Sequence, residues 1–484
     1  MALIPEIKSA CNTDIPITGI AYNSRYVQKG DLFVALKGEK TDGALYIAEA
    51  VANGAVAAAS EEVLSAPEIP HIRVKDARRF LAEISHVFYN SPCSKLKLAA
   101  VTGTKGKTTT VWLIDSIFAR AGLASCFMGT IEMKIREERF PSIHTTPEAP
   151  DIDRFFNQSA GRGCTHGSLE VSSHAIALKR VYGAKFALGV FTNLSHDHLD
   201  FHGDMETYYQ AKKTLFTTEN GNEIETAVVN TDDSYGSRLA GEIQIPVTTF
   251  GFNKDADIHV KDWHSRLDGT DMVLDTPEGE IAFHCRLVGR TNAYNIMAAT
   301  GAALCLGFTG EQIRDGVEAL SGIPGRMERV DGGQDFLVVV DYAHTPASLE
   351  NLLETAKLLP HQKLITVFGC GGDRDRGKRP LMGEIAARLS DVVIVTSDNP
   401  RSEDPAQIIN EIEPGLKKGS AVCVINPDRY AAIREAINMA GRDDIVIIAG
   451  KGHETYQIVG DRRLAFDDRN TVRKIINYEL GIRN

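Results

Sequence analysis

The sequence lacks the features that would place the protein in a membrane or in a disulfide-linked class. No run approaches the ~18 consecutive apolar residues of a membrane-spanning helix, and the opening MALIPEIKSA has no basic flank followed by an apolar stretch. The eight cysteines include no C-x-x-C pair, which argues against a zinc ribbon or a disulfide framework. We therefore expect a cytoplasmic protein without membrane insertion, whose thiols are reduced and mostly buried.

The sequence also has no surplus of basic residues. Its 53 Lys and Arg residues are outnumbered by 64 Asp and Glu residues, which gives a formal net charge of −11. Because nucleic-acid backbones are bound mainly through Lys and Arg, we expect no nucleic-acid partner. The sequence shows no internal repeat, and its 43% hydrophobic content is typical of a globular protein with several buried cores.

The 484 residues are enough for about two to four domains, and the changes in residue pattern along the chain favour three. Residues 1–95 combine short apolar runs such as Asp31–Leu36 with Ala-rich stretches such as Ala44–Ala59, which we predict to be helical. Residues 96–322 begin with an apolar run and a glycine loop, and residues 323–484 follow the linker SGIPG. The predicted boundaries are therefore 1–95, 96–322 and 323–484.

Predicted strands and helices alternate along the second and third domains. The second domain has predicted strands at Gly167–Val171, Phe186–Thr192, Thr226–Asn230 and Pro246–Phe250. The third has them at Phe336–Tyr342, Lys363–Cys370, Asp391–Ser397, Ala421–Asn426 and Asp444–Ala449. This alternation predicts an α/β protein with mainly parallel sheets. In a doubly wound sheet of this kind, ligands bind beyond the carboxyl ends of the strands.

A glycine loop lies between an apolar strand and a helix. Gly103–Thr108 reads GTKGKT directly before the predicted helix Thr109–Ala119. Such a loop directs backbone N–H groups at a phosphate, while Lys107 can reach its oxygens and Thr108 can coordinate magnesium. Val101 stands where G-x-x-x-x-G-K-[ST] needs glycine, so the loop is a shorter variant. The predicted ATP-binding residues here are Gly103, Thr104, Lys105, Gly106, Lys107 and Thr108. The alternative is a glycine turn with solvated lysines.

Acidic and histidine side chains follow the next two strands. Glu170 ends one of them, where its carboxylate could bind the same magnesium ion. The following run NLSHDHLDFHG contains three histidines. A metallohydrolase cluster of the H-x-H-x-D-H kind is one interpretation, but Phe201 breaks its spacing. Contacts with neighbouring residues are the alternative for His196 and His202, whereas we favour a role at the metal or phosphate for His198.

Lys212 falls within an apolar stripe of a predicted helix, while Lys213 points aside. The stripe contains Met205, Tyr208, Tyr209, Leu215 and Phe216. A buried ammonium group costs several kcal/mol unless it is compensated. Lys212 therefore either extends to the surface or is partnered or chemically modified near the ATP site.

Charged side chains follow the strands of the third domain. Asp341 is placed to accept hydrogen bonds from a ribose. Arg374 stands where G-x-G-x-x-G needs its last glycine, so we do not expect a nicotinamide dehydrogenase. The loops also supply Arg379, Asp398, Asn399, Arg401, Lys451, His453 and Glu454. Guanidinium groups suit carboxylates and acids suit an ammonium, so these residues predict an amino-acid site. A salt-bridged surface rim is the alternative.

Ordered motifs along the chain resemble a known family. They are GTKGKTTT, HTTPE, LEVSSHAIALKRV, FTNLSHDHLDFHGDMETYYQAK, RTNAYNIMAA, GIPGRMERV, DYAHTP, GCGGDRDRGKRP, DNPR and GKGHE. Together they resemble the Mur ligases of bacterial cell-wall synthesis, from Tyr22 to past Asp467. Within this family, the likeness is greatest to members that extend UDP-N-acetylmuramoyl-L-alanyl-D-glutamate. The DNPR loop is similar to that of members adding meso-2,6-diaminopimelate rather than lysine.

This resemblance implies a fold and a reaction. The expected fold has a small α/β UDP-substrate domain, a central P-loop ATPase domain and a C-terminal Rossmann-like domain. In the expected reaction of peptidoglycan precursor synthesis, ATP phosphorylates the glutamate carboxylate, and the amino group of the added amino acid attacks the acyl phosphate. We expect a monomer. Another Mur ligase, such as a lysine-adding one, or a folylpolyglutamate synthase is an alternative. A nucleotide-switched binding protein would explain the phosphate loop but not the amino-acid pocket.

The resemblance also implies individual roles. Thr108 and Glu170 would bind one magnesium ion, and Lys212, as N6-carboxylysine, would bind a second with His198. Asn295 would face the adenine, Arg326 the transferring phosphate and Asp341 the ribose. The expected catalytic residues are Lys107, His198, Lys212 and Arg326. The expected UDP-substrate residues are Ser24, Thr145, Thr146, Ser172 and Arg180. The expected amino-acid residues are Arg374, Asp398, Asn399, Pro400, Arg401, Gly450 and Glu454.

Overall fold

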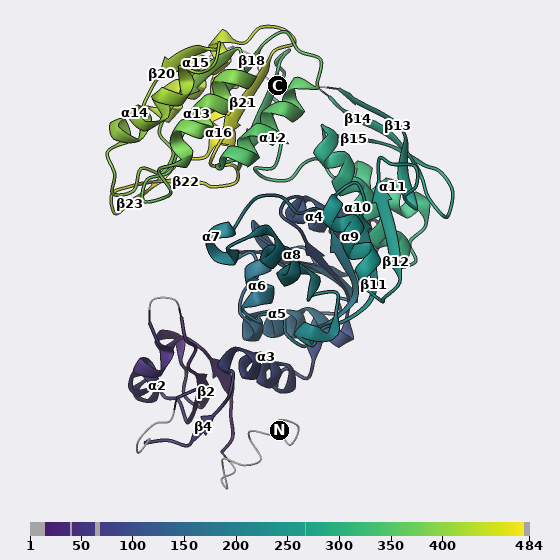
Figure 1. Cartoon of the computed structure of the whole chain (residues 1–484), viewed down its shortest axis with the longest axis vertical. Coiled ribbons are helices and arrows are strands. Elements are labelled where there is room, and N and C mark those ends of the chain that lie inside the picture. The colour runs from purple at the N-terminus through teal and green to yellow at the C-terminus, as the bar shows by residue number, and fades with distance from the viewer. Residues whose placement is uncertain (1–14, 39–40, 63–67, 267, 479–484) are drawn as a thin grey trace. The chain divides into compact units, whose positions relative to one another are not determined.

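The computed structural model describes residues 15–38, 41–62, 68–266 and 268–478 (Figure 1). The chain forms two compact units. The first comprises Met1–His259, Thr276–Gly279 and Asn295–Gly316, and the second comprises Val260–Asp275, Glu280–Tyr294 and Val317–Asn484. The predicted α/β class is confirmed in both units. The boundaries predicted at residues 95 and 322 stay a prediction.

A small parallel sheet occupies the N-terminal part of the first unit. Its strands follow the order β1 (Gly19–Ala21), β2 (Asp31–Val34), β3 (Ala57–Ser60) and β4 (His71–Arg73). The helical elements of this part are η1 (Ser24–Tyr26), η2 (Gly43–Tyr46), α2 (Ile47–Ala52), α3 (Ala77–Phe88) and η3 (Pro92–Lys95). Buried side chains of α3 pack on one face of this sheet, and those of α2 pack on the other.

The helix predicted over Ala44–Ala59 is wrong beyond Ala52. Gly54 adopts a positive φ of 112° after the end of α2, and the chain then enters strand β3. Every residue of β3 is buried, and its side chains pack alternately into the clusters on the two faces of the sheet. Burial on both faces of a parallel sheet thus overrides the helical preference of alanine.

A larger sheet forms most of the rest of the first unit. Within this unit its strands run in the order β12-β11-β10-β5-β9-β6-β7-β8, and the first two residues of β13 pair with β12. The pairing is parallel from β13 to β6 and antiparallel from there to β8. The strands are β5 (Lys97–Thr102), β6 (Ser125–Met128), β7 (Glu132–Ile135), β8 (Glu138–Pro141), β9 (His166–Glu170), β10 (Lys185–Phe191), β11 (Glu223–Asn230), β12 (Val247–Gly251) and β13 (Ile258–Arg266). The helices are α4 (Lys107–Arg120), α5 (Ala149–Gly161), α6 (Ser173–Ala177), α7 (Leu199–His202), α8 (Met205–Lys213), η4 (Thr218–Asn220), α9 (Ser234–Glu242), α10 (Arg290–Cys305) and α11 (Gly310–Ala319).

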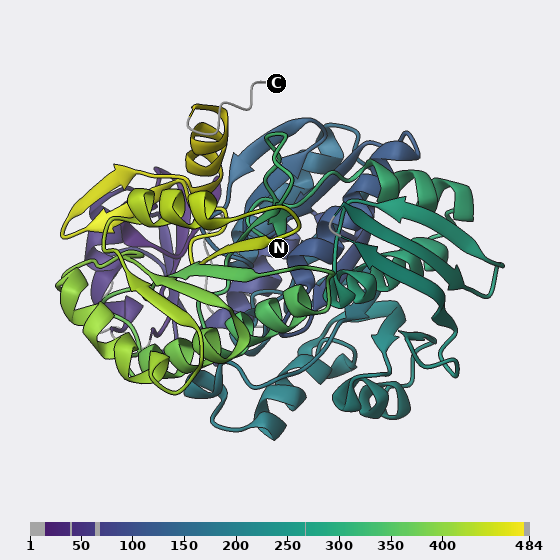
Figure 2. The same ribbon diagram turned by 90° about the horizontal axis from the view of Figure 1, so that it is seen from above.

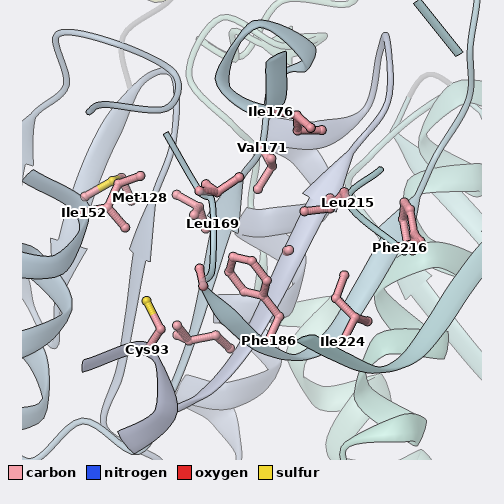
Figure 3. Close-up of a cluster of buried hydrophobic side chains, with 14 of the residues drawn as sticks. Cys93, Met128, Ile152, Leu169, Val171, Ile176, Phe186, Leu215, Phe216 and Ile224 are labelled. Carbon is pink, nitrogen blue, oxygen red and sulfur yellow. The ribbon is translucent and has the colours of Figure 1, made fainter. Parts of the chain in front are cut away.

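One buried hydrophobic cluster supports the strands that carry the candidate site. Leu169 of β9, Phe186 of β10 and Ile224 of β11 belong to it, as do Ile152 of α5 and Ile176 of α6 (Figure 3). Because protein interiors are closely packed, these contacts fix the strand ends relative to one another. The loops that follow the strands therefore start from rigid positions.

The second unit contains a doubly wound sheet in the order β16-β17-β21-β18-β19-β20. The strands are β16 (Glu328–Arg329), β17 (Leu337–Asp341), β18 (Leu364–Phe368), β19 (Val392–Val395), β20 (Val422–Ile425) and β21 (Ile445–Ala449). The helices α12 (Pro346–Lys357), α13 (Lys378–Leu389) and α14 (Pro405–Leu416) cover one face, and α15 (Arg429–Met439) and α16 (Asp468–Tyr478) cover the other (Figure 1). Only the short β16 is antiparallel to its neighbour.

Antiparallel strands complete the second unit. β14 (Gly269–Asp275) pairs with β15 (Ile281–Cys285), and β22 (Tyr456–Val459) pairs with β23 (Arg462–Ala465). The second hairpin is the yellow pair of strands in Figure 2. It forms a bridge to Arg401 and so contacts one of the predicted amino-acid loops.

Helix length and the state of the cysteines can be assessed in the described residues. Among them, no helix has both the length and the apolar character needed to cross a lipid bilayer. Their cysteines are all free: five are buried, Cys305 is half-buried and Cys423 is exposed. Cys11 lies outside the described residues. The prediction of reduced, mostly buried thiols is confirmed for the described part of the chain.

Candidate functional site

The predicted phosphate loop connects β5 to α4 at the carboxyl edge of the larger sheet. Gly103 and Gly106 have positive φ values of 151° and 85°. A Cβ atom would lie 1.9 Å from Thr192 Oγ1 at Gly103 and 2.4 Å from Asn295 Oδ1 at Gly106. Both positions therefore require glycine for their backbone conformation and for their space.

Thr192 and Asn193, which follow β10, hold the loop in place. Asn193 accepts hydrogen bonds from Thr104 N at its backbone oxygen (2.9 Å) and from Lys105 N at its side-chain oxygen (3.0 Å). Thr192 Oγ1 donates to Lys105 O at 2.6 Å. Neither residue was predicted to be part of the site, although a position at the end of a strand is a signal that could have identified both.

The cation of Lys107 lies over the loop. Its Nζ atom donates to Gly103 O at 2.8 Å and to Thr104 O at 3.0 Å. The ammonium group is thus positioned at the start of α4, where backbone N–H groups and the helix dipole favour an anion. This arrangement suits a phosphate chain.

Glu170 is buried beside the loop, with 1% of its surface exposed. Its carboxylate accepts hydrogen bonds from Thr108 Oγ1 (3.0 Å), Thr130 N (2.8 Å) and Thr130 Oγ1 (2.9 Å). A Cβ atom on Gly129 would lie 2.3 Å from Glu170 Oε1, so that position must also be glycine. A carboxylate next to a threonine hydroxyl is a set of oxygen donors that suits magnesium. Thr130, which the sequence analysis missed, follows β6 at the same sheet edge.

Lys212 is buried rather than extended to the surface, with 1% of its surface exposed. Its Nζ atom donates to Gly103 O at 3.0 Å and to Thr102 Oγ1 at 3.3 Å, and it lies 5.0 Å from the centre of the Tyr208 ring. Burial, together with the nearby Lys107 cation, holds the pKa of Lys212 well below its ordinary range. A lowered pKa favours the neutral amine, which is the form that nucleophilic chemistry at nitrogen requires.

The three histidines of the predicted cluster have different environments. His202 is 7% exposed, with Nε2 2.9 Å from Ser173 Oγ and its ring stacked on Tyr208 at 4.8 Å. His196 is exposed. His198 has a positive φ of 55°, a side chain that is 44% exposed, and a pKa lowered by burial. Within the described residues, no three His, Cys, Asp or Glu side chains are grouped as metal ligands. The histidine run is therefore not a preformed three-ligand centre.

Four of the five predicted UDP-substrate residues lie near Glu170. Thr146 Oγ1 donates to Glu170 O at 2.7 Å and accepts from Ser172 N at 3.1 Å, and Arg180 Nη1 donates to Thr146 O at 2.9 Å. Thr145 Oγ1 accepts from Thr130 Oγ1 at 3.1 Å. Ser24 belongs to η1 of the N-terminal sheet region, where its hydroxyl donates to Glu49 at 2.7 Å.

In the second unit, Asp341 ends β17, as predicted. Its carboxylate accepts hydrogen bonds from Met327 N and Ala343 N, both at 2.7 Å, and burial raises its pKa. The Arg326 guanidinium lies 5.1 Å from the centre of the Tyr342 ring. Arg326 and Asp341 are thus close together, although the backbone N–H groups occupy part of the acceptor capacity of Asp341.

The predicted amino-acid residues meet at the carboxyl edge of the second sheet. Asn399 donates to Glu454 at 2.9 Å, and Lys451 Nζ bonds both Asn399 Oδ1 (3.1 Å) and Glu454 (3.0 Å). A Cβ atom on Gly450 would lie 2.5 Å from Asp398 Oδ2. Lys451 is fully buried, so it is a structural partner of this network and not part of a surface rim.

Two of the predicted arginines lie along one glycine loop. Arg401 Nη1 donates to Gly372 O at 2.7 Å, while Arg374 is exposed and Nη1 donates to Asp373 O at 2.9 Å. Arg401 has a positive φ of 52°, and its backbone is held by hydrogen bonds with β22 and Gly460. Non-glycine residues with this conformation are uncommon and tend to occur at functional sites.

Arg379 is buried and is not exposed at these loops. Its side chain is 0% exposed and forms ion pairs with Glu403 (2.9 Å) and Glu411 (2.7 Å). Glu403 also accepts a hydrogen bond from Asp373 N at 2.6 Å. Arg379 therefore connects the loop of Arg374 to the loop of Arg401 from below.

Comparisons with known proteins match the chain along its length. Residues 16–89 match the model "Mur ligase family, catalytic domain", residues 101–303 match "Mur ligase middle domain", and residues 325–452 match "Mur ligase, glutamate ligase domain". A relative from Solibacter usitatus is 45% identical over 95% of this chain and 93% of its own length. The chain belongs to the Mur ligase family.

Two relatives of this Mur ligase have one name in common. The proteins from Solibacter usitatus and Geobacter metallireducens, the latter 44% identical over 95% of this chain and 94% of its own, are both UDP-N-acetylmuramoyl-L-alanyl-D-glutamate–2,6-diaminopimelate ligases. A solved structure of a protein with that name aligns with a TM-score of 0.71 and 34% identity over 97% of each chain. The phosphate loop, Glu170 and Lys212 fall in the segment that matches the Mur ligase middle domain.

The buried His202 predicts a specific pH dependence of stability in this Mur ligase. Burial, with the nearby His174 and Lys212, lowers its pKa from 6.5 to about 4. The unfolded chain then binds more protons between pH 4 and 6.5, so stability is lost as pH falls through that window. In His202→Gln, we expect the fall in Tm between pH 7 and 4.5 to be smaller than in the wild type, by roughly 2 °C or more. Thermal unfolding at several pH values measures this fall in Tm.

His264→Gln is the control, because its side chain is 69% exposed, and it should show the same dependence of Tm on pH as the wild type. An unchanged dependence of Tm on pH in His202→Gln would contradict the prediction.

Proposed function

We propose that this chain is an ATP-dependent ligase that adds meso-2,6-diaminopimelate to the D-glutamate of UDP-N-acetylmuramoyl-L-alanyl-D-glutamate, in peptidoglycan precursor synthesis. The observation that carries the proposal is 45% identity over 95% of the chain to a relative with the corresponding name. The phosphate loop and the amino-acid loops supply the groups that this reaction needs.

Gly103–Thr108 binds the phosphate chain of ATP. The backbone N–H groups at the start of α4 face the anion, and Lys107 stays over the loop through its two carbonyl contacts. Thr108 Oγ1 and Glu170 Oε2, which lie 3.0 Å apart, would hold a magnesium ion, and this ion would supply positive charge beside the phosphate oxygens. Asn295, next to Gly106, faces the adenine, and Asp341 binds the ribose.

Lys212 acts as N6-carboxylysine. Its neutral amine attacks carbon dioxide and loses a proton, which leaves a carbamate anion on the side chain. This change would supply oxygen ligands for a second magnesium ion, which His198 would help to hold. It also removes the like-charge repulsion with Lys107, which contributes to the low pKa of Lys212.

The bond-forming sequence has two steps. The glutamate carboxylate takes the terminal phosphoryl group of ATP, which gives an acyl phosphate and ADP, with Arg326 facing the transferring phosphate. The amino nitrogen of diaminopimelate then attacks the carbonyl carbon, the C–O bond to phosphate breaks, and the nitrogen loses a proton to give the amide. Ser24, Thr145, Thr146, Ser172 and Arg180 hold the UDP-substrate during both steps.

The second unit selects the amino acid. Asp398, Asn399, Pro400, Gly450 and Glu454 form the part of the pocket that receives one end of diaminopimelate. Arg374 and Arg401 bind the distal carboxylate, which lysine lacks. Guanidinium groups bind carboxylates through paired, charge-assisted hydrogen bonds, so a site built in this way discriminates strongly against an amino acid without that carboxylate.

A coupled assay of phosphate release tests the proposed function. We expect release from ATP to need both the UDP-dipeptide and meso-diaminopimelate, and to fall at least about tenfold when lysine replaces diaminopimelate. A preference for lysine would indicate a lysine-adding member, and release with a folate substrate would indicate a folylpolyglutamate synthase. Phosphate release whose rate depends on neither the UDP-dipeptide nor the amino acid would indicate a nucleotide switch and contradict the proposal.

Replacing Lys212 tests the carbamate. We expect Lys212→Ala to lower turnover at least about 100-fold, because a metal ligand is lost, and small carboxylates such as formate to restore part of it. Lys213→Ala is the matched control. Lys213 is the next residue of α8 and pairs with Glu242 at 2.8 Å, so its loss should change turnover less than about twofold. Full activity in Lys212→Ala would remove this lysine from the mechanism.

Replacing Arg401 tests the selection of the distal carboxylate. We expect Arg401→Ala to lower kcat/KM for diaminopimelate by about 10- to 100-fold, with little change for lysine, because a hydrogen bond to a charged group is lost. Arg376→Ala is the control in the same loop. The Arg376 side chain is 55% exposed and pairs with Glu411. An unchanged ratio of diaminopimelate to lysine use in Arg401→Ala would refute the assignment.

A further inference from the structure

One fully buried ion pair lies beneath the loops that we assign to the amino acid. Arg429, the first residue of α15, and Asp468, the first residue of α16, both have side chains that are 0% exposed. Arg429 Nε and Nη2 donate to the two carboxylate oxygens of Asp468 at 2.8 and 2.7 Å. The pair has the parallel two-bond geometry that arginine forms with carboxylates. It thus fixes the guanidinium plane.

The same guanidinium also binds the ends of two strands. Nη2 donates to Ala449 O at 3.1 Å, at the end of β21, and Nη1 donates to Ser397 O at 3.3 Å, two residues past β19. β19 and β21 are not neighbours in the sheet, because β18 lies between them. Arg429 is therefore a direct link between two loops that the sheet ladder joins only through a third strand.

The two bound carbonyl groups lie immediately before proposed pocket residues. Ser397 precedes Asp398, and Ala449 precedes Gly450. Since the peptide unit is planar, holding each carbonyl oxygen also orients the peptide group that leads into the next residue. The loops approach so closely that a Cβ atom on Gly450 would lie 2.5 Å from Asp398 Oδ2. A small change in the position of either carbonyl would alter this spacing.

The positive charge of Arg429 is neutralised by a residue that is not one of the proposed amino-acid-binding residues. Burial alone would lower the pKa of this guanidinium, but the adjacent Asp468, with smaller contributions from Asp398 and Glu454, raises it. The arginine therefore stays protonated and is neutralised mainly by Asp468.

We propose that Arg429, held by Asp468, is a positioning residue that sets the spacing between the loops at Asp398 and Gly450, and through it the affinity for the amino-acid substrate. This inference rests on the proposed function. Arg429 does not itself touch the substrate. Its loss should therefore act on the amino acid selectively and leave the ATP and UDP-substrate sites unchanged.

Steady-state kinetics of Arg429→Lys test this role. Lysine keeps the positive charge but cannot make the planar fork to a carboxylate and two carbonyl groups. We expect KM for diaminopimelate to rise at least about tenfold, while KM for ATP and for the UDP-dipeptide changes less than about twofold. Equal increases in all three KM values, or no increase for diaminopimelate, would overturn the proposal.

A matched core variant separates positioning from general loss of stability. Ile437 lies on the same helix as Arg429, is 1% exposed and packs in the core beneath the sheet. Ile437→Ala should lower Tm through the cavity that it leaves without raising KM for diaminopimelate. If Ile437→Ala raises that KM as much as Arg429→Lys does, the effect of Arg429 is destabilisation alone and the proposal is wrong.

Asp468→Asn provides a second test if Arg429→Lys does not fold. This nearly isosteric change removes the charge that neutralises Arg429, so KM for diaminopimelate should again rise selectively. An unchanged KM, or failure of both variants to fold, would leave Arg429 a purely structural residue and overturn the proposal. A wild-type protein that releases no phosphate with diaminopimelate would instead contradict the proposed function, so the two failures are distinct.

Discussion

Two side chains of opposite charge type, Glu170 and Lys212, are buried at the carboxyl edge of the larger sheet, and the loops around them are arranged to satisfy their hydrogen bonds. A buried charge is costly unless polar groups surround it. Glu170 receives two hydroxyl groups and one N–H, and Lys212 donates to a carbonyl and a hydroxyl oxygen. Both therefore rely on dipoles of the phosphate loop and its neighbours. In the function that we propose, the burial that destabilises these groups also prepares them to bind a metal ion and to react.

Much of the fold could be predicted because local signals agree with the tertiary structure. The predicted strand Asp444–Ala449 differs by one residue from β21, and the predicted strand Phe186–Thr192 is shifted by one residue from β10. Continuous runs of Val and Ile in a parallel sheet are buried on both faces, so they are easy to distinguish from helices. The loop at Gly103–Thr108 was equally clear, since its glycines, lysine and threonine are all required locally.

Other features depend on contacts that sequence spacing does not reveal. Ala57–Ser60 forms a strand because clusters cover both of its faces, although its alanines favour a helix. Strands β14 and β15 were not predicted, even though Ile281–Cys285 alternates between buried and exposed residues, which is a usable signal. The acidic partners of the buried Arg379 and Arg429 lie 24 to 39 positions away in the sequence. Only the folded chain shows that these arginines are buried beneath the loops that we assign to the amino acid.

The left-handed backbone of Arg401 has a consequence for protein engineering. A glycine or asparagine at this position would adopt φ near 52° with less strain, so a redesign guided by stability alone would favour replacing the arginine. That substitution would relax the backbone, but it would also remove the guanidinium group. Thermostabilised versions of this chain should therefore keep position 401 fixed, along with the hairpin whose hydrogen bonds sustain its conformation.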